Sequence, residues 1–240
     1  MIFEIKKAAK NISYLVNESA ISLSSTDYED YFNREKILKD TSVEFRGGRG
    51  QTLLYKKDGL ELVLRHYKRG GLIGKLIKDK FCLFENHCHR AFDEFYLLAE
   101  LLKRNLPVPR PIIAKEQRFG LCLVQDIVVE RFIGFDDLSY VIAKRALTDE
   151  EYESIGLCVK RFFDANVYHT DLNIRNILIN NESKVSVIDF DKCFLLNNLS
   201  DKLKHSMIER LLRSFHKEIS KNTVFFSEIG FEKLKIASLS

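Results

Sequence analysis

The stretch YHTDLNIRNILIN, residues 168–180, decides the fold. His169 is followed two residues later by Asp171, and Asn176 comes five residues after that aspartate. The apolar run at 177–179 predicts a short strand, and NNES after it predicts a turn. VSVIDFD, residues 185–191, predicts a second strand with Asp189 near its end. A hairpin of these strands would bring Asp171, Asn176 and Asp189 to one end of the pair.

Two carboxylates and an amide that converge in this way suit phosphoryl transfer. That chemistry needs a base to orient the attacking hydroxyl, and Asp171 fits this role. It also needs hard oxygen ligands for Mg²⁺, which Asn176 and Asp189 would supply. A lone H-x-D has little meaning, but H-x-D-x-x-x-x-N followed by a turn and I-D-F is far more specific. The alternative reading makes Asp171 and Asn176 turn-capping residues and Asp189 a polar strand end.

A glycine cluster, RGGRG at residues 46–50, lies between two strand-like runs. Glycine lets a backbone approach a phosphate closely, so Gly47, Gly48 and Gly50 are candidates for covering a nucleotide. A simple turn is the alternative explanation. Asp58-Gly59 farther on predicts a tight hairpin turn.

Helical spacing of apolar residues predicts the helices. RAFDEFYLLAELLKRN, residues 90–105, repeats apolar side chains with one buried face, namely Phe92, Phe95, Tyr96, Ala99 and Leu102. All three prolines follow between residues 107 and 111 and exclude helix there. Thr148 and Glu151 form a capping box at the start of a second helix. Residues 201–219 predict an amphipathic third helix.

The order of these elements predicts an α+β fold. Strands and one main helix fill residues 1–132, a β-rich part, and helices around the H-x-D loop fill residues 133–240. A chain of 240 residues can form one good core or two small lobes.

Composition restricts the class of protein. A net charge of +4 is too weak to indicate a nucleic-acid partner. We see no apolar run long enough to span a membrane, and the first residues lack the features of a secretory signal. Five scattered cysteines do not indicate a disulfide framework. These features predict a cytoplasmic protein.

One segment is strongly basic. RHYKRGGLIGKLIKDK, residues 65–80, contains six lysines and arginines against a single acid, Asp79. Such a cluster attracts anions, although a run of charged residues usually forms only a solvent-exposed face.

With these motifs in place, the sequence resembles the protein-kinase-like fold. HTDLNIRN is similar to the catalytic loop and IDFD to the metal-binding D-F-G motif. Within that fold it resembles the lipopolysaccharide kinases, and among them the 3-deoxy-D-manno-octulosonic acid (Kdo) kinases of Gram-negative bacteria. GGRGQT, LVLRHYKRGGLIGKLIKDKF and RAFDEFYLLAELLKRNLPVPRP carry this resemblance together with the catalytic loop. It covers most of the chain between about residues 45 and 195.

The resemblance implies a two-lobed fold with a β-rich N-lobe and a reduced α-rich C-lobe. It implies ATP-dependent phosphorylation of a Kdo hydroxyl, taken as the 4-hydroxyl, on a lipid A precursor in lipopolysaccharide core synthesis. It further implies Mg²⁺, a peripheral place on the cytoplasmic face of the inner membrane, and no nucleic-acid partner. The basic segment would then bind an anionic acceptor and an anionic membrane surface.

The resemblance also implies residue roles. Asp171 would be the base, and Asn176 and Asp189 the metal ligands. Gly47, Gly48 and Gly50 would cover the phosphates. Glu94 resembles the helix glutamate that pairs with a strand lysine in kinases. The basic residue on that strand would bind the nucleotide phosphates.

The sequence departs from the kinase pattern in several places. Arg65 stands where the strand lysine is expected, and Lys68 is the alternative if the strand register differs, since strand faces flip with each residue. The glycine motif is G-G-x-G, D-F-G is D-F-D, and Thr170 replaces the arginine of H-R-D. Only 49 residues follow Asp191, with no A-P-E motif.

Other functions of the same fold stay open. A heptose kinase or another small-molecule kinase would use the same catalytic residues but would not explain the basic segment. A compact protein kinase lacks an activation segment here. A pseudokinase, a binding module without activity, is disfavoured because Asp171, Asn176 and Asp189 are all present.

Overall fold

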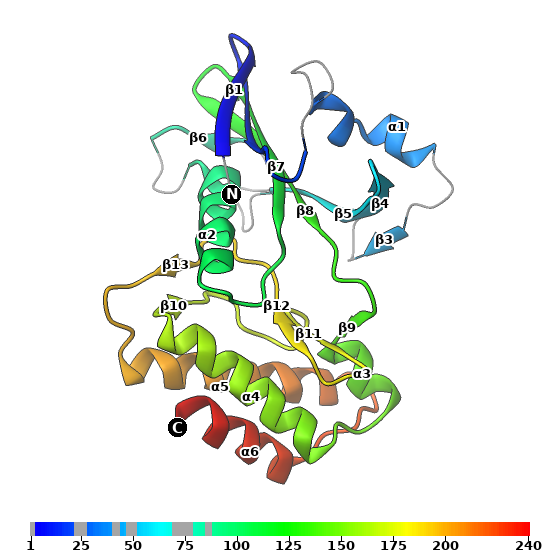
Figure 1. Ribbon diagram of the computed structural model, residues 1–240. Coiled ribbons are helices and arrows are strands. Elements are labelled where there is room, and N and C mark those ends of the chain that lie inside the picture. Colours follow the sequence, from blue (N-terminus) through cyan, green and yellow to red (C-terminus); the bar gives the residue numbers. More distant parts are fainter. Residues whose placement is uncertain (1–2, 22–27, 40–43, 47–51, 69–78, 85–87) are drawn as a thin grey trace. The chain divides into compact units, whose positions relative to one another are not determined.

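The computed structural model describes residues 3–21, 28–39, 44–46, 52–68, 79–84 and 88–240. These form two compact units, whose elements are labelled in Figure 1. The first unit contains Met1–Ala99 and Pro109–Arg131, and the second contains Glu100–Val108 and Phe132–Ser240. The expected division into lobes at residues 132 and 133 stays a prediction, and the structure groups Glu100–Val108 with the second unit.

The first unit contains an antiparallel sheet. Its strand order is β1-β2-β7-β8-β5-β4-β3, and β6 pairs with β8. The strands are β1 (Phe3–Ala9), β2 (Ile12–Asn17), β3 (Glu44–Arg46), β4 (Thr52–Lys57), β5 (Leu60–His66), β6 (Phe81–Cys82), β7 (Pro111–Phe119) and β8 (Cys122–Glu130). The two strands latest in sequence, β7 and β8, therefore occupy the middle of the sheet.

Two tight turns follow directly from the residues that form them. Asp58 and Gly59 both have positive φ, of 51° and 76°, which confirms the predicted turn between β4 and β5. These paired positive values belong to the hairpin turn that matches the twist of the strands. Gly120 has φ of 59° at the tip between β7 and β8, where the sequence also predicts a turn.

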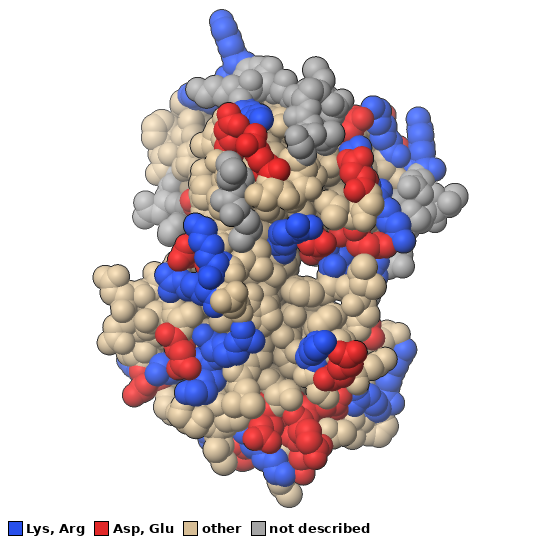
Figure 2. Space-filling model, in the orientation of Figure 1, with Lys and Arg blue, Asp and Glu red and all other residues tan. Residues whose placement is uncertain are grey.

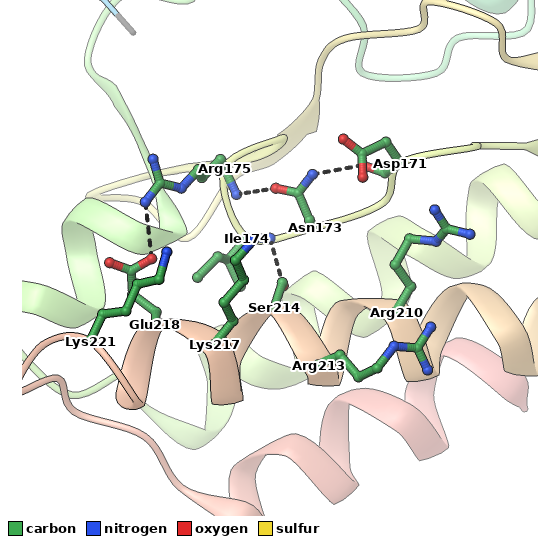
Figure 3. Close-up of a pocket in the computed structure, with 10 residues that line it drawn as sticks. All are labelled: Asp171, Asn173, Ile174, Arg175, Arg210, Arg213, Ser214, Lys217, Glu218 and Lys221. Atoms are coloured by element: carbon green, nitrogen blue, oxygen red, sulfur yellow. Dashed lines mark hydrogen bonds and ion pairs between the residues drawn. The ribbon is translucent and has the colours of Figure 1, made fainter. Parts of the chain in front are cut away.

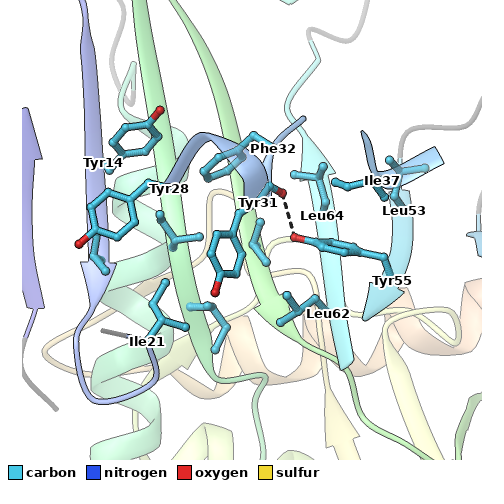
Figure 4. Packing of buried hydrophobic residues seen from close by; sticks show 14 residues of the cluster. Tyr14, Ile21, Tyr28, Tyr31, Phe32, Ile37, Leu53, Tyr55, Leu62 and Leu64 are labelled. Carbon is cyan, nitrogen blue, oxygen red and sulfur yellow. Dashed lines mark hydrogen bonds between the residues drawn. The ribbon is translucent and has the colours of Figure 1, made fainter. Parts of the chain in front are cut away.

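One core of this unit combines tyrosine and phenylalanine rings with aliphatic side chains (Figure 4). The short helices η1 (Tyr28–Tyr31) and α1 (Arg34–Leu38) supply part of it. Tyr14 stacks on Phe32 with ring centroids 5.9 Å apart, and the buried hydroxyl of Tyr55 donates to the Tyr31 carbonyl at 2.8 Å. Each buried phenol thus brings a large apolar area, and its polar end finds a partner.

Helix α2 (Arg90–Lys103) confirms the helix predicted at residues 90–105. Phe92, Phe95 and Ala99 are buried as expected. Tyr96 is 46% exposed, so its assignment to the buried face is wrong. The buried face is rotated toward Ala91, Leu98 and the carboxylate of Glu94, a polar residue that hydrophobic periodicity does not count as core.

The second unit is mainly helical and contains three pairings between short strands. Its elements are β9 (Phe135–Asp137), α3 (Leu138–Lys144), α4 (Asp149–Asp164), β10 (Val167–Tyr168), β11 (Ile177–Asn180), β12 (Val185–Val187), β13 (Phe194–Leu195), α5 (Asp201–Ile219) and α6 (Glu228–Leu239). β11 pairs with β12 and β9, and β10 pairs with β13. The two units together confirm the α+β class.

Helix α4 begins as predicted. The Thr148 hydroxyl accepts from the Glu151 amide at 3.2 Å, and the Glu151 carboxylate accepts from the Thr148 amide at 2.9 Å. Arg145 also holds Glu151, with Nη2 and Oε1 2.7 Å apart. These donors stabilise the carboxylate and lower the pKa of Glu151, the Arg145 hydrogen bond having the largest effect.

Helix α6 packs against α4 at two glycines. A Cβ placed on Gly156 would lie 2.4 Å from the Leu234 carbonyl oxygen, and one on Gly230 would lie 2.3 Å from the Tyr152 ring. Both glycines therefore let the two helices approach more closely than any other residue would allow.

Charge is spread over the face of the molecule drawn in Figure 2, where basic and acidic side chains alternate. A search of the described residues finds no helix with the length and apolar character of a membrane span.

Candidate active site

Asp171 lies in the loop between β10 and β11, and hydrogen bonds fold this loop on itself. Its carbonyl oxygen accepts from the side-chain amides of Asn173 and Asn176, each at 2.9 Å. The Arg175 amide donates to Asn173 Oδ1 at 2.8 Å. The carboxylate-bearing residue itself is exposed, whereas Asn176 is buried. A fixed backbone therefore presents a solvent-accessible carboxylate, as a base for a bound substrate requires.

His169 holds the start of the same loop. Its Nε2 donates to the Ile188 carbonyl at 3.1 Å, and its Nδ1 accepts from the Asp171 amide at 3.2 Å. The imidazole meets the Phe190 ring edge-on, with centroids 4.9 Å apart. Burial lowers the pKa of His169, so the neutral ring is favoured, in agreement with a ring nitrogen that accepts a backbone proton.

Asp189 is brought beside Asn176 by the β11–β12 pairing. Ile177 lies opposite Val187 in this ladder, and the Ile188 amide continues it by donating to the Asn176 carbonyl at 2.9 Å. The second strand ends at Val187, earlier than the expected residues 185–191. It ends there because Asp189 has φ of 66°, a left-handed conformation that a strand cannot contain.

The structure thus brings together Asp171, Asn176 and Asp189, all within the second unit. Asn176 uses its side-chain nitrogen on the Asp171 carbonyl, so its oxygen is the atom left to coordinate a cation. One amide oxygen and one carboxylate are hard donors of the kind that Mg²⁺ prefers. No cluster of three or more His, Cys, Asp or Glu suited to a metal occurs in the described part of the chain. The donor set therefore fits a cation shared with substrate phosphates better than an all-protein cage.

Arg65 and Glu94 form a second group, in the first unit. Arg65 Nη2 on β5 lies 2.6 Å from Glu94 Oε2 on α2, and the Tyr67 hydroxyl donates to the same oxygen. The Glu94 side chain is only 1% exposed, so this ion pair is largely desolvated. Lys68, the alternative partner, lies beyond β5 and is exposed.

Two sequence expectations lie outside the described residues. Gly47, Gly48 and Gly50 belong to the range 47–51, and most of the basic segment belongs to the range 69–78. Their assignment as phosphate-covering and anion-attracting residues stays a prediction.

A pocket of about 490 Å³ opens beside Asp171 in the second unit (Figure 3). One wall is the loop from Asp171 to Arg175, and the other is helix α5 with Lys221 just beyond its end. The Ser214 hydroxyl on α5 accepts from the Ile174 amide at 3.1 Å and donates to the Leu211 carbonyl at 2.6 Å, which ties loop to helix. The amphipathic pattern of residues 201–219 favours core packing over a partner site, and nothing in it indicates the pocket.

Known proteins match this chain over most of its length. The lipopolysaccharide kinase (Kdo/WaaP) family model matches residues 36–235. The 3-deoxy-D-manno-octulosonic acid kinase of Vibrio cholerae is 40% identical over 184 residues, 77% of each protein. That of Haemophilus influenzae is 37% identical over 198 residues, 79% of this chain and 81% of the relative. Both the motifs and the similarity point to one conclusion, that the chain belongs to the lipopolysaccharide kinase (Kdo/WaaP) family.

Proposed function

We propose that the protein transfers the γ-phosphoryl group of ATP to a hydroxyl of Kdo, the 4-hydroxyl, on a lipid A precursor in lipopolysaccharide core biosynthesis. The observation that carries this proposal is that the Asn176 side chain bonds to Asp171 and the Ile188 amide, next to Asp189, bonds to the Asn176 carbonyl, in a chain of this family. The relatives named as Kdo kinases support the choice of acceptor.

The reaction needs little covalent chemistry from the protein. The acceptor oxygen forms a bond to the γ-phosphorus, the bond from that phosphorus to the β–γ bridging oxygen breaks, and ADP leaves. Asp171 orients the hydroxyl and takes its proton. Mg²⁺, held by Asn176 and Asp189, would supply charge neutralisation on the phosphate oxygens.

The nucleotide assignments extend this proposal. Arg65 supplies the cation for the ATP phosphates, and Glu94 fixes its guanidinium through the 2.6 Å ion pair. Gly47, Gly48 and Gly50 cover the phosphates. Arginine keeps the charge of the usual lysine and adds a planar fork suited to two phosphate oxygens.

The proposed partners are the Kdo-bearing lipid A precursor and an anionic membrane surface, which the protein meets peripherally on the cytoplasmic face. The basic segment at residues 65–80 supports this, since each lysine or arginine near an anionic leaflet contributes about 1 kcal/mol. A nucleic-acid partner is not proposed.

Mass spectrometry of a reaction of purified protein, Mg-ATP and Kdo-bearing lipid A precursor tests the proposal. Heptosylated core oligosaccharide and a generic protein substrate serve as competing acceptors. One added phosphoryl group on the Kdo lipid, with NMR placing it on the 4-hydroxyl, is the expected result. Phosphate on heptose or on protein would keep the kinase chemistry and overturn the acceptor. No transfer to any acceptor, with Mg-ATP bound, would favour a pseudokinase.

A further inference from the structure

Helix α5 presents a row of cations to the pocket beside Asp171. Arg210, Arg213 and Lys217 recur at intervals of three and four residues, which places them on one helix face, and Lys221 follows just after the helix ends. In Figure 3, Arg210 extends from α5 toward the loop that carries Asp171. The neighbouring face of the same helix is buried core, with Met207, Leu211 and Phe215.

The pocket has an excess of positive charge. Five of its lining residues are lysine or arginine, and two, Asp171 and Glu218, are acidic. Glu218 is already engaged, because it accepts from Arg175 at 3.0 Å and from Asn222 at 2.7 Å. Within the described part of the chain, neither Arg210 nor Lys217 has a carboxylate at ion-pair distance. The excess charge is therefore not neutralised by the protein itself.

Arg210 is the least satisfied of these cations. Its Nε is buried and has no hydrogen-bond partner among the described residues. A buried donor without an acceptor costs free energy, and such an atom in a native protein calls for a ligand or another explanation. Burial, and to a smaller extent the charge of Arg210, lowers the pKa of His169 at the start of the loop that carries Asp171.

We propose that this pocket holds the acceptor, and that Arg210, assisted by Lys217, binds an anionic group of the acceptor beside the hydroxyl that reacts. The inference rests on the proposed function for the identity of the acceptor. A carboxylate of the reacting sugar is the group that fits. Asp171 and Arg210 line the same small pocket, so an anion bound by Arg210 and the hydroxyl oriented by Asp171 belong to one sugar. The relatives' named substrate is an acid.

The pocket is of a suitable size and rigidity for such a sugar. About 490 Å³ lies in the range of small-molecule sites. The Ser214–Ile174 hydrogen bond keeps the distance between helix and loop constant, so an anion held by α5 fixes the sugar relative to Asp171. A bidentate guanidinium–carboxylate contact would also fix its orientation.

The experiment compares Arg210→Gln, Lys217→Gln and Arg210→Lys with the matched control Lys202→Gln, an exposed lysine of α5 that does not line the pocket. Steady-state kinetics give KM for ATP and for the acceptor. Equilibrium binding of Kdo and of the Kdo lipid is measured by calorimetry without nucleotide. Three acceptors are used: the Kdo lipid, its Kdo methyl ester, and the Kdo lipid without its lipid A phosphates.

Arg210→Gln should weaken acceptor binding about 10- to 100-fold, the usual value of a charge-assisted hydrogen bond, and leave KM for ATP within about twofold. The methyl ester should bind wild type as weakly as the acid binds the variant, and should lose nothing further in the variant. Arg210→Lys should recover part of the loss, and Lys202→Gln should match wild type. Because Arg210 has no internal partner at Nε, Arg210→Gln should melt within about 2 °C of wild type.

Equal losses with acid and ester would overturn the carboxylate contact. If in addition the phosphate-free acceptor lost nothing in the variant, the anion would be a lipid phosphate. Unchanged acceptor binding in Arg210→Gln would remove the pocket from acceptor recognition while wild-type transfer still supported the proposed function. Arg210-dependent binding of Kdo without transfer would support the pocket and overturn the function.

Discussion

Asp171 combines an exposed carboxylate with a backbone held by two asparagine side chains. Asp171→Asn keeps the size and the backbone hydrogen bonds but removes the base. We expect turnover to fall at least about 100-fold, with the melting temperature unchanged. Asp164→Asn, an exposed carboxylate at the end of α4, is the control. Near-normal turnover of Asp171→Asn in the mass-spectrometric assay would exclude Asp171 from the chemistry.

Arg65 neutralises a carboxylate that has almost no contact with water. Arg65→Ala should lower the free energy of unfolding by about 3 kcal/mol, because the Glu94 carboxylate stays buried after the loss of its 2.6 Å ion pair. The double variant Arg65→Ala/Glu94→Gln should lose less, since no buried charge remains. Urea unfolding of both variants measures this, and equal losses would show that the ion pair is not the cause.

His169 should make stability depend on pH. Its pKa in the folded protein lies below the ordinary value of about 6.5, because burial disfavours the imidazolium. Below pH 6.5 the unfolded chain takes up a proton that the folded chain does not bind, so stability falls as pH falls. Between pH 8 and pH 5.5 the loss from this group is at most about 1.4 kcal/mol.

Urea unfolding at these two pH values, for wild type and His169→Gln, isolates that contribution. Other titrating groups contribute to both proteins and cancel in the difference. Wild type should lose about 1 kcal/mol more than the variant on acidification. Parallel losses would mean that the imidazole is accessible to protons in the folded state.

At the scale of the element, α4 and α6 depend on the missing side chain of Gly156. Gly156→Ala places a methyl group 2.4 Å from the Leu234 carbonyl oxygen, and backbone cannot move aside as a side chain can. We expect a loss of about 2 kcal/mol in stability, although alanine is the better helix former. Glu153→Ala, on the exposed side of α4, is the control and should be neutral. Thermal melting distinguishes the two, and a stabilised Gly156→Ala would contradict this packing.

Local patterns predicted the elements whose signals are local. The capping box at Thr148 depends only on neighbouring residues, and so do the turns at Asp58-Gly59 and Gly120. Helix α6 was not predicted, because Gly230 and Ser238 belong to its buried face while Ile229 and Ile236 are exposed. Its hydrophobic pattern therefore does not mark the side that packs. Strands β1 and β2 were also missed; β2 pairs with β7, which is far away in sequence, and β1 joins the sheet only through β2.

The candidate site was predicted in the same uneven way. Asp171, Asn176 and Asp189 form an ordered motif, so the sequence could indicate that they meet. Prediction of the ion pair between Arg65 and Glu94 requires the correct strand register, because a shift of one residue turns each side chain to the opposite face of the sheet. The basic face of α5 could not be recognised, because Arg210 and Lys217 look like solvated helix residues until tertiary structure places them in one pocket with Asp171.

At the scale of the whole molecule, charge should govern association with membranes. The protein should co-sediment with vesicles containing anionic lipid at low salt and dissociate as salt is raised, because such attraction is screened. Phosphatidylcholine vesicles are the control. Lys75→Glu/Lys78→Glu should weaken this binding and acceptor use more than ATP binding. Equal binding of the double variant would place the membrane contact elsewhere.

The strand order has a consequence for how the chain is made. β7 and β8 lie between β2 and β5, so the sheet of the first unit has no centre until residue 130 has left the ribosome. Until then β2 and β5 expose edges that will later be paired, and such edges invite association with other nascent chains. Synthesis of this protein therefore contains an interval, from the emergence of β5 to that of β8, in which a chaperone has most to protect.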